Sequence, residues 1–301
     1  MQHNTLKGVA YILFSVLVWA GWMIASRFAV KNTLGAADIA ILRFGTARVL
    51  LLPFAFKHGL RAGPWGLKSG FLLSVLIGAP YTYLAVWGML YAPASHASTI
   101  INGTLLVLTT IIGIRTLRET TSTIRMAGVA VSVAGIACML CAKSAYDGQQ
   151  QWLGHVLFVI SGLMWGGYTL LVRAWNIDAF KATIVVCVWS LIYTVPLYLL
   201  FADHHIGFSN WQAVVFQALY QGVLNSIIAF VAFNRGIHLL GASRAGALTP
   251  LVPVLTTLLA IPMLGEVPSL LEWTGVIGVS LGVFLSSGVI SRRAQATVPE
   301  I

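Results

Sequence analysis

Aromatic and polar side chains recur at helical spacing inside long apolar stretches of this chain. Ser15, Trp19 and Trp22 follow one another at i, i+4 and i+7, which places them on one face of a helix. Residues 161–173 repeat this spacing around Trp165, 146 residues further along the chain. Aromatic faces bind aromatic groups by offset or edge contacts and organic cations by cation–π attraction. The pattern therefore indicates non-covalent recognition of a small amphipathic molecule.

Carboxamides form a similar row near the middle of the second half. Gln217, Gln221 and Asn225 follow at i, i+4 and i+8. A polar row that faces lipid is expensive, so it is expected to face protein or a wet cavity. Helix–helix hydrogen bonding is the alternative for every such row. The candidate substrate-binding residues are Ser15, Trp19, Trp22, Tyr81, Asn102, Trp165, Tyr168, Gln221 and Asn225.

Two arginines, Arg43 and Arg48, interrupt the apolar stretch 37–56. Arg43 is placed to extend toward the membrane surface. Arg48 lies near mid-depth, where an arginine costs at least about 2.5 kcal/mol on insertion scales. Two roles for Arg48 stay open, namely hydrogen bonds to helix carbonyls and binding of a substrate carboxylate.

Three prolines, Pro80, Pro250 and Pro253, also fall inside apolar stretches. Each leaves the carbonyl four residues earlier without its usual helical donor. At membrane depth such a carbonyl must find another partner or line a wet cavity. The prolines therefore indicate helix breaks or gating positions. A simple kink and coordination of a substrate ammonium are both open.

The sequence contains no pattern typical of catalysis or metal binding. The histidines and the acidic residues all lie in loops or near the ends of apolar stretches, so no pair of catalytic groups is expected. No G-x-x-x-x-G-K-[ST] loop occurs. Cys138, Cys141 and Cys187 lie within apolar stretches, where small packing residues are the expected role. We therefore expect no enzymatic activity, no catalytic residue, no cofactor and no metal.

The composition is that of a protein embedded in lipid. Hydrophobic residues make up 58% of the 301 residues and charged residues only 9%, against about 25% charged in soluble domains. The net charge of +10 is spread between apolar stretches, so nucleic acid is not an expected partner. A bilayer core of about 30 Å needs roughly 20 apolar residues per helix. The stretches that meet this requirement lie at about 8–29, 37–56, 69–90, 95–114, 124–142, 154–174, 181–201, 212–234, 244–264 and 270–290.

The basic residues predict how these ten spans are oriented. Loops on one side hold most of the Lys and Arg, including Arg292 and Arg293 after the last span, whereas the other side holds Arg27, Lys31 and Lys143. Cytoplasmic loops carry the excess of Lys and Arg. Both termini are therefore predicted to lie in the cytoplasm.

The two halves of the chain resemble each other. Besides the match of 161–173 to 15–27, Glu119 corresponds to Glu266 and Gly135 to Gly282, each at a separation of 147 residues. Five spans per half is an odd number, so the second half must enter the membrane from the opposite face. We therefore predict an all-α integral membrane protein of ten transmembrane helices in two inverted five-helix repeats. It forms a single transmembrane domain over 1–301, with repeats of approximately 1–145 and 146–301.

Two glycine-rich stretches, 124–142 and 270–290, differ from the others. Small residues let helices approach closely, so we expect peripheral packing helices or a dimer contact. The protein is accordingly expected to be a monomer or a weak homodimer.

The ten spans, the repeated Trp-x-Gly helix, Leu264-Gly265-Glu266 before the last span and the glycine-rich final helix resemble the EamA branch of the drug/metabolite transporter superfamily. Within it, the chain is most similar to bacterial inner-membrane exporters of aromatic amino acids. The resemblance implies that helices one to four and six to nine enclose a cavity. Unlike the small multidrug pumps of this superfamily, the chain is expected to have no mid-membrane carboxylate.

Inverted repeats around a midplane site are typical of secondary transporters. We therefore expect a bacterial inner-membrane secondary transporter that exports small amphipathic solutes, aromatic or other neutral amino acids, by alternating access through a central cavity. Its expected partners are the bilayer and a small-molecule substrate, an amino acid or an organic cation. Export of aromatic organic cations such as methyl viologen or of other metabolites, and a non-transporting receptor or channel, remain alternatives.

Overall fold

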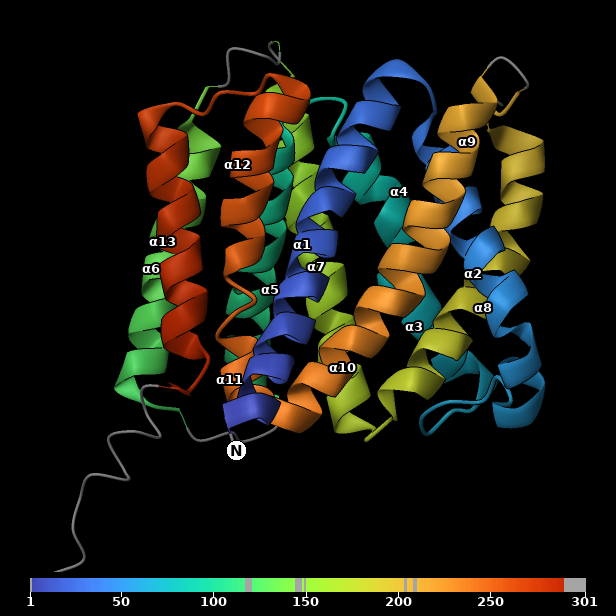
Figure 1. Ribbon diagram of the computed structural model, residues 1–301, viewed down its shortest axis with the longest axis horizontal. Helices are drawn as coiled ribbons and strands as arrows, with labels where there is room; N and C mark the ends of the chain where they lie inside the picture. The colour runs from blue at the N-terminus through green and yellow to red at the C-terminus, as the bar shows by residue number, and fades with distance from the viewer. Residues whose placement is uncertain are drawn as a thin grey trace, which may run out of the picture.

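The computed structural model describes residues 2–116, 121–143, 148, 150–202, 205–207 and 210–289. The positions of Glu119, Arg292 and Arg293 in the sequence analysis lie outside these residues. No strand occurs in this part of the chain, which folds as a bundle of helices that run roughly alongside one another (Figure 1). Nine of its helical segments are long and apolar enough to cross a membrane, and a tenth, α13, has 17 residues. At 1.5 Å per residue α13 is about 26 Å long, slightly less than a bilayer core.

The helices coincide with the apolar stretches of the sequence, and three of the spans consist of more than one helical element. The elements are α1 (Gln2–Asn32), α2 (Ala36–His58), α3 (Leu67–Ile77), α4 (Ala79–Gly88), α5 (Ala94–Thr116), α6 (Thr123–Cys141), α7 (Gln151–Ala174), α8 (Ala179–Phe201), α9 (Trp211–Gln217), the π-helix η2 (Ala218–Ile228), α10 (Ala229–Leu240), α11 (Ala242–Gly246), α12 (Leu251–Leu264) and α13 (Leu270–Ser286). Below, the third span means α3 with α4, the eighth α9 with η2 and α10, and the ninth α11 with α12.

The third span breaks at Gly78. The following proline has no amide hydrogen to continue α3, and Pro80 begins the new helix α4 instead. The neighbouring helix α8 compensates for the break, since the Ala79 amide donates to Ser190 Oγ at 3.3 Å and Tyr193 Oη donates to the Ser74 carbonyl at 3.0 Å. Polar side chains of α8 thus bond to the backbone on both sides of the break.

The eighth span contains eleven residues of π-helix between two α-helical ends. Ser226 Oγ donates to the Gln221 carbonyl at 2.7 Å, five residues earlier, which gives the wider backbone turn a side-chain donor. Such π segments are rare and frequently occur at functional sites. Here the segment packs against α1 and α2.

Most of the larger contacts join the two halves of the chain. α1 packs on α10 and α12, α5 on α7, α2 on α8 and η2, and α3 and α4 on α8 and α7 respectively. The glycine-rich helices α6 and α13 lie side by side at one edge of the bundle (Figure 1).

The small residues of α6 and α13 face each other. A Cβ on Gly135 would lie 2.7 Å from the Val279 amide nitrogen and 2.9 Å from the Gly275 carbonyl oxygen. Because position 135 is glycine, α6 can approach the backbone of α13 more closely than any residue with a Cβ would allow. The expected packing role is confirmed, because the glycine-rich faces of α6 and α13 cover each other within the chain.

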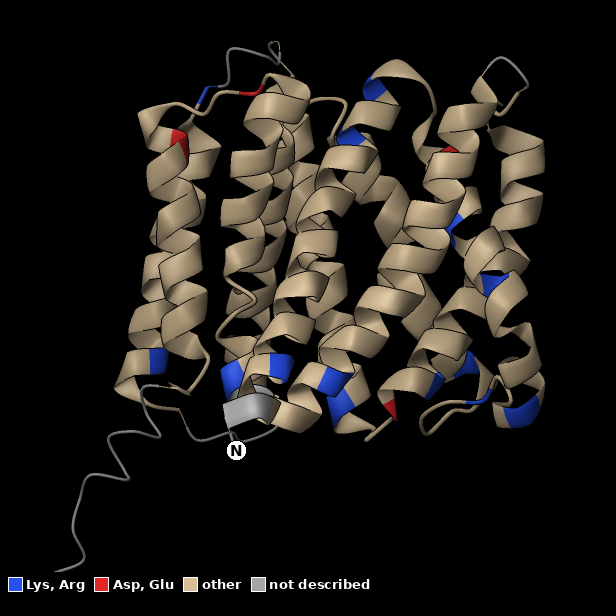
Figure 2. Ribbon diagram, in the orientation of Figure 1, with Lys and Arg blue, Asp and Glu red and all other residues tan. Residues whose placement is uncertain are grey.

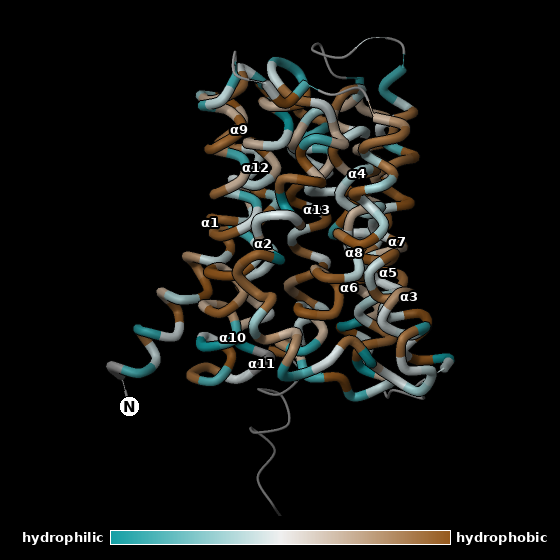
Figure 3. The backbone as a smooth tube through the Cα atoms, turned by 90° about the vertical axis from the view of Figure 1, so that its right-hand side faces the viewer, coloured by the Kyte–Doolittle hydropathy of each residue, from teal (hydrophilic) through white to brown (hydrophobic). Residues whose placement is uncertain are grey.

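Charge and hydropathy are distributed along the bundle as in a membrane protein. The Lys and Arg residues gather at the end where the N-terminus lies, with fewer at the opposite end (Figure 2). Hydrophilic segments are concentrated toward the two ends of the bundle, and the band between them is largely hydrophobic (Figure 3).

Candidate functional site

A cavity of about 590 Å³ lies between the two halves of the bundle. Every span except α6 contributes side chains to its wall. Of the candidate residues from the sequence, seven line this cavity: Trp19, Trp22, Tyr81, Asn102, Trp165, Tyr168 and Asn225. Ser15 and Gln221 do not.

Aromatic rings form a continuous part of the wall. Trp22 on α1 and Tyr81 on α4 stack with their ring centroids 6.3 Å apart, and Trp165 on α7 meets Tyr81 edge-on at 6.1 Å. Trp19 packs against Phe233 of α10 at 4.8 Å. These rings come from both halves, so the duplicated Trp motif contributes to one shared wall.

The short polar side chains of the wall are mostly occupied by their own helices. Thr109, Thr169 and Thr183 each donate to a carbonyl four residues earlier, at 2.7–2.9 Å. Asn102 Nδ2 donates to the Ser98 carbonyl at 2.7 Å. In contrast, Asn225 Oδ1 is buried and accepts no hydrogen bond from the described residues. The cavity thus contains a free acceptor on η2.

Arg43 supplies the free donors. It lines the cavity, and its guanidinium carbon lies 5.3 Å from the Trp22 ring centroid and 5.5 Å from that of Phe44. Its Nε and Nη1 are buried and have no hydrogen-bond acceptor among the described residues. Arg43 therefore does not extend to the membrane surface but points its charge into the bundle.

A second arginine, Arg173 at the end of α7, also lines the cavity. The described lining residues include no Asp or Glu. Arg48, in contrast, is half-buried outside the cavity, and no hydrogen bond joins its guanidinium to the described part of the chain. The charged group that faces the cavity from the middle of α2 is therefore Arg43.

Ser15 and Gln221 lie in the contact between α1 and the eighth span. Ser15 Oγ is 2.8 Å from the Ala229 carbonyl, and Gln221 Nε2 donates to Ser26 Oγ at 2.9 Å. Gln217 Nε2 donates to the Ala25 carbonyl at 2.8 Å in the same contact. For these residues the structure places the polar row between helices, and only Asn225 of the carboxamide row reaches the cavity.

The proline carbonyls of the ninth span are also satisfied internally. The Gly246 carbonyl accepts from Thr249 Oγ1 at 2.8 Å, and the Thr249 carbonyl accepts from the Val252 amide at 3.0 Å. Pro250 precedes α12 directly and Pro253 is buried in its first turn. The two prolines therefore mark the change from α11 to α12, and neither lines the cavity.

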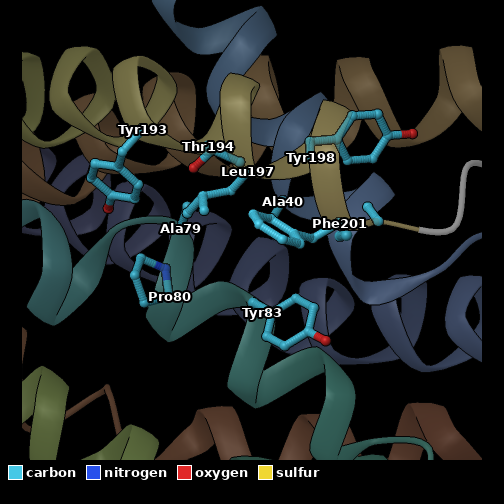
Figure 4. A pocket seen from close by; sticks show the side chains of 11 residues that line it. Ala40, Ala79, Pro80, Tyr83, Tyr193, Thr194, Leu197, Tyr198 and Phe201 are labelled. Carbon is cyan, nitrogen blue, oxygen red and sulfur yellow. The ribbon is translucent and has the colours of Figure 1, made fainter.

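Pro80 lines a different, smaller pocket of about 330 Å³. Pro80 and Tyr83 of α4 lie on one side of it, with Tyr193 and Leu197 of α8 on the other (Figure 4). Its wall includes no Lys, Arg, Asp or Glu from the described chain. It therefore lacks the ionic groups that distinguish the central cavity.

Two buried polar networks lie outside both pockets, where α5 begins. Arg27 Nε donates to Glu266 Oε1 at 2.6 Å, and the Ala94 amide donates to the other oxygen of Glu266 at 3.1 Å. Arg27 also donates to the Met89 carbonyl. The ion pair joins the end of α1 to the connection between α12 and α13.

The second network brings together histidines and an acidic residue that the sequence placed only near the ends of apolar stretches. His96 Nδ1 lies 2.8 Å from His155 Nε2, and His96 Nε2 lies 2.6 Å from Glu272 Oε1. All three residues are buried. They come from the first turns of α5, α7 and α13, and helix ends far apart in sequence meet here because the spans alternate in direction.

Comparison with known proteins agrees with this architecture. The sequence profile of the EamA-like transporter family matches residues 6–141 and again residues 152–288. The chain belongs to this family. The resemblance inferred from the sequence is thus confirmed, and the protein is a multi-pass membrane protein of a transporter family.

Relatives of this EamA-family chain extend over nearly its whole length. A protein of Archaeoglobus fulgidus described as an uncharacterized transporter is 27% identical, covering 92% of this chain and 96% of its own. A probable terminal-alkyne amino-acid exporter of Streptantibioticus cattleyicolor is also 27% identical, covering 97% and 98%. A solved crystal structure is similar with a TM-score of 0.62 at 19% identity, covering 98% of this chain and 99% of the other, which supports the fold.

The sequence did not indicate that Arg43, Arg173 and Phe233 would meet at the cavity. Position along a span gives the depth of Arg43 but not the direction of its side chain, and Arg173 falls at the end of its span, among the basic residues that predict orientation. No pattern in the sequence gives the direction of Arg43, because Leu50, seven residues later and on the same side of a regular helix, is exposed.

Proposed function

We propose that the protein exports small amphipathic solutes, aromatic or other neutral amino acids, by alternating access through the central cavity. The observation that carries this proposal is the aromatic cavity of about 590 Å³ between the two halves. Pockets of about 300–1,000 Å³ are typical of small-molecule sites. An amino acid with an aromatic side chain fits such a volume and such a wall.

The free polar groups of the cavity favour a zwitterion. Arg43 Nε and Nη1 are donors without acceptors in the described structure, and Asn225 Oδ1 is an acceptor without a donor. A carboxylate complements the first and an ammonium the second. The relative described as a probable terminal-alkyne amino-acid exporter supports the same solute class and the direction of transport.

Aromatic organic cations are less well supported. A desolvated cation gains about 2 kcal/mol from an aromatic face. A cation about 6 Å from the Arg43 guanidinium loses about 3 kcal/mol per charge at an effective dielectric constant of about 20. For a dication such as methyl viologen, the repulsion exceeds the attraction.

Alternating access requires two related halves, and the proposal includes an inverted repeat of five helices. It is supported by the double match of the family profile and by the pairing of helices. α1 packs on the eighth span and its counterpart α7 packs on the third span, as a two-fold relation requires. The gathering of Lys and Arg at the N-terminal end (Figure 2) supports cytoplasmic termini in a bacterial inner membrane.

Efflux from proteoliposomes tests the proposal. Vesicles that contain the protein are loaded with labelled tryptophan and diluted, and release is compared with that from protein-free vesicles. We expect faster release with protein, and competition by phenylalanine but not by nucleosides or sugars. Release equal to that of empty vesicles for every amino acid would reject the proposed solute class and direct attention to the other solutes.

A further inference from the structure

We propose that the guanidinium of Arg43 binds the carboxylate of the transported solute, so that a carboxylate is required and a positively charged amine alone is not accepted. This inference deepens the proposed function and depends on the central cavity being the solute site. Arg43 is chosen because its charge lies inside the bundle and its Nε and Nη1 donate to no described residue.

The described acids that could neutralise Arg43 are engaged elsewhere. Asp38 accepts from the Gly35 amide at 2.7 Å and from Tyr198 Oη at 2.5 Å. Glu266 and Glu272 belong to the two buried networks outside the cavity. An arginine in a low-dielectric interior without an anion is costly. A bound carboxylate would remove this cost.

The aromatic neighbours leave room for such an anion. Trp22 and Phe44 lie at cation–π distance from the guanidinium carbon. An aromatic ring accepts no conventional hydrogen bond from these groups, and Nε and Nη1 remain without an acceptor among the described residues. Two parallel N–H groups match the two oxygens of a carboxylate, which makes such pairs strong and directional.

Apart from Arg173 at the end of α7, the remaining hydrogen-bonding groups of the described wall do not offer an alternative anion site of equal quality. The threonines of the wall already donate to their own helices, as does Asn102. Among the described residues of the cavity wall, the Trp22 indole N–H is the other buried donor without an acceptor, and it belongs to the ring beside the guanidinium. Both unused donor groups therefore lie together, where the carboxylate is placed.

Three probes with one ring and different end groups test the proposal. Phenylalanine carries both charges, 3-phenylpropionate only the carboxylate, and phenethylamine only the ammonium. Each is titrated against the purified full-length protein in detergent, and the ligand-dependent rise in melting temperature gives its Kd. We expect both carboxylates to bind, and phenethylamine to bind at least tenfold more weakly than 3-phenylpropionate.

Substitution of Arg43 then tests whether this residue causes the preference for a carboxylate over an ammonium. In Arg43→Gln, the Kd of 3-phenylpropionate is expected to rise at least tenfold while that of phenethylamine stays the same or falls. Arg43→Lys keeps the charge but not the planar fork, and is expected to lie in between. Arg48→Gln is the matched control on the same helix outside the cavity, and should leave all three values unchanged.

Two results would overturn the proposal. One is wild-type protein that binds phenethylamine as tightly as 3-phenylpropionate or binds neither carboxylate. The other is an unchanged preference in Arg43→Gln. If the variant does not fold, the wild-type comparison decides alone. Failure of tryptophan efflux with intact carboxylate binding would reject the proposed solutes but not this site.

Discussion

Arg27 and Arg43 are two arginines inside one helix bundle, and they differ in what surrounds them. Arg27 is 3% exposed and bonded to Glu266, which the Ala94 amide also contacts. Arg43 faces an aromatic cavity with two buried nitrogens that no described residue accepts from. Arg27 thus has an ionic partner inside the bundle, whereas Arg43 and Asn225 present unused hydrogen-bonding atoms to the cavity.

The largest expected effect comes from breaking the ion pair between Arg27 and Glu266. Glu266→Gln leaves the Arg27 charge buried without an anion, which should lower the free energy of unfolding by about 3–5 kcal/mol. Arg43→Met removes a charge that has no ion partner in the described chain, so the ligand-free protein should keep or gain stability. Thermal unfolding of both purified variants in detergent measures the difference. Equal destabilisation would mean that Arg43 also has a structural role.

The next effect concerns the aromatic wall. Trp165→Ala removes a ring that packs against Tyr81 in the cavity, and an aromatic pair contributes about 0.5–1.5 kcal/mol beyond the area it buries. We expect about a tenfold loss in transport efficiency for the best amino acid, measured as initial rates in proteoliposomes. Trp273→Ala on α13, outside the cavity, is the control and should have much less effect. Similar losses would contradict the assignment of the cavity.

The smallest expected effect is in the contact between α1 and the eighth span. Ser15→Ala removes the hydrogen bond to the Ala229 carbonyl. Bonds between membrane helices contribute about 0.6 kcal/mol on average. A small decrease in melting temperature with normal transport is expected. A large loss of transport with unchanged stability would instead indicate that Ser15 contacts the solute.

The difference between polar groups inside helix contacts and those at the cavity also shows which features could be predicted from sequence. Span positions follow from local hydropathy, and the wall residues Trp19, Trp22 and Trp165 follow from a repeated spacing. The direction of each polar row depends on which helix packs beside it, so Ser15 and Gln221 could not be separated from Asn225. The π-helical turns add to this difficulty, because they rotate Asn225 relative to a regular α-helical row. The pairing of His96 with Glu272 depends on contacts across 176 residues of sequence.

The central claim is that solute passes through the cavity, and a thiol-protection measurement tests it most directly. Thr109 on α5 lines the cavity, whereas Thr274 on α13 is exposed on the outside. Each is changed to cysteine in a background with Cys138, Cys141 and Cys187 replaced by serine, and tryptophan efflux is measured after treatment with a small methanethiosulfonate. The account predicts that labelling stops efflux only in Thr109→Cys, and that saturating tryptophan slows the labelling. Normal efflux after complete labelling of Thr109→Cys would contradict it.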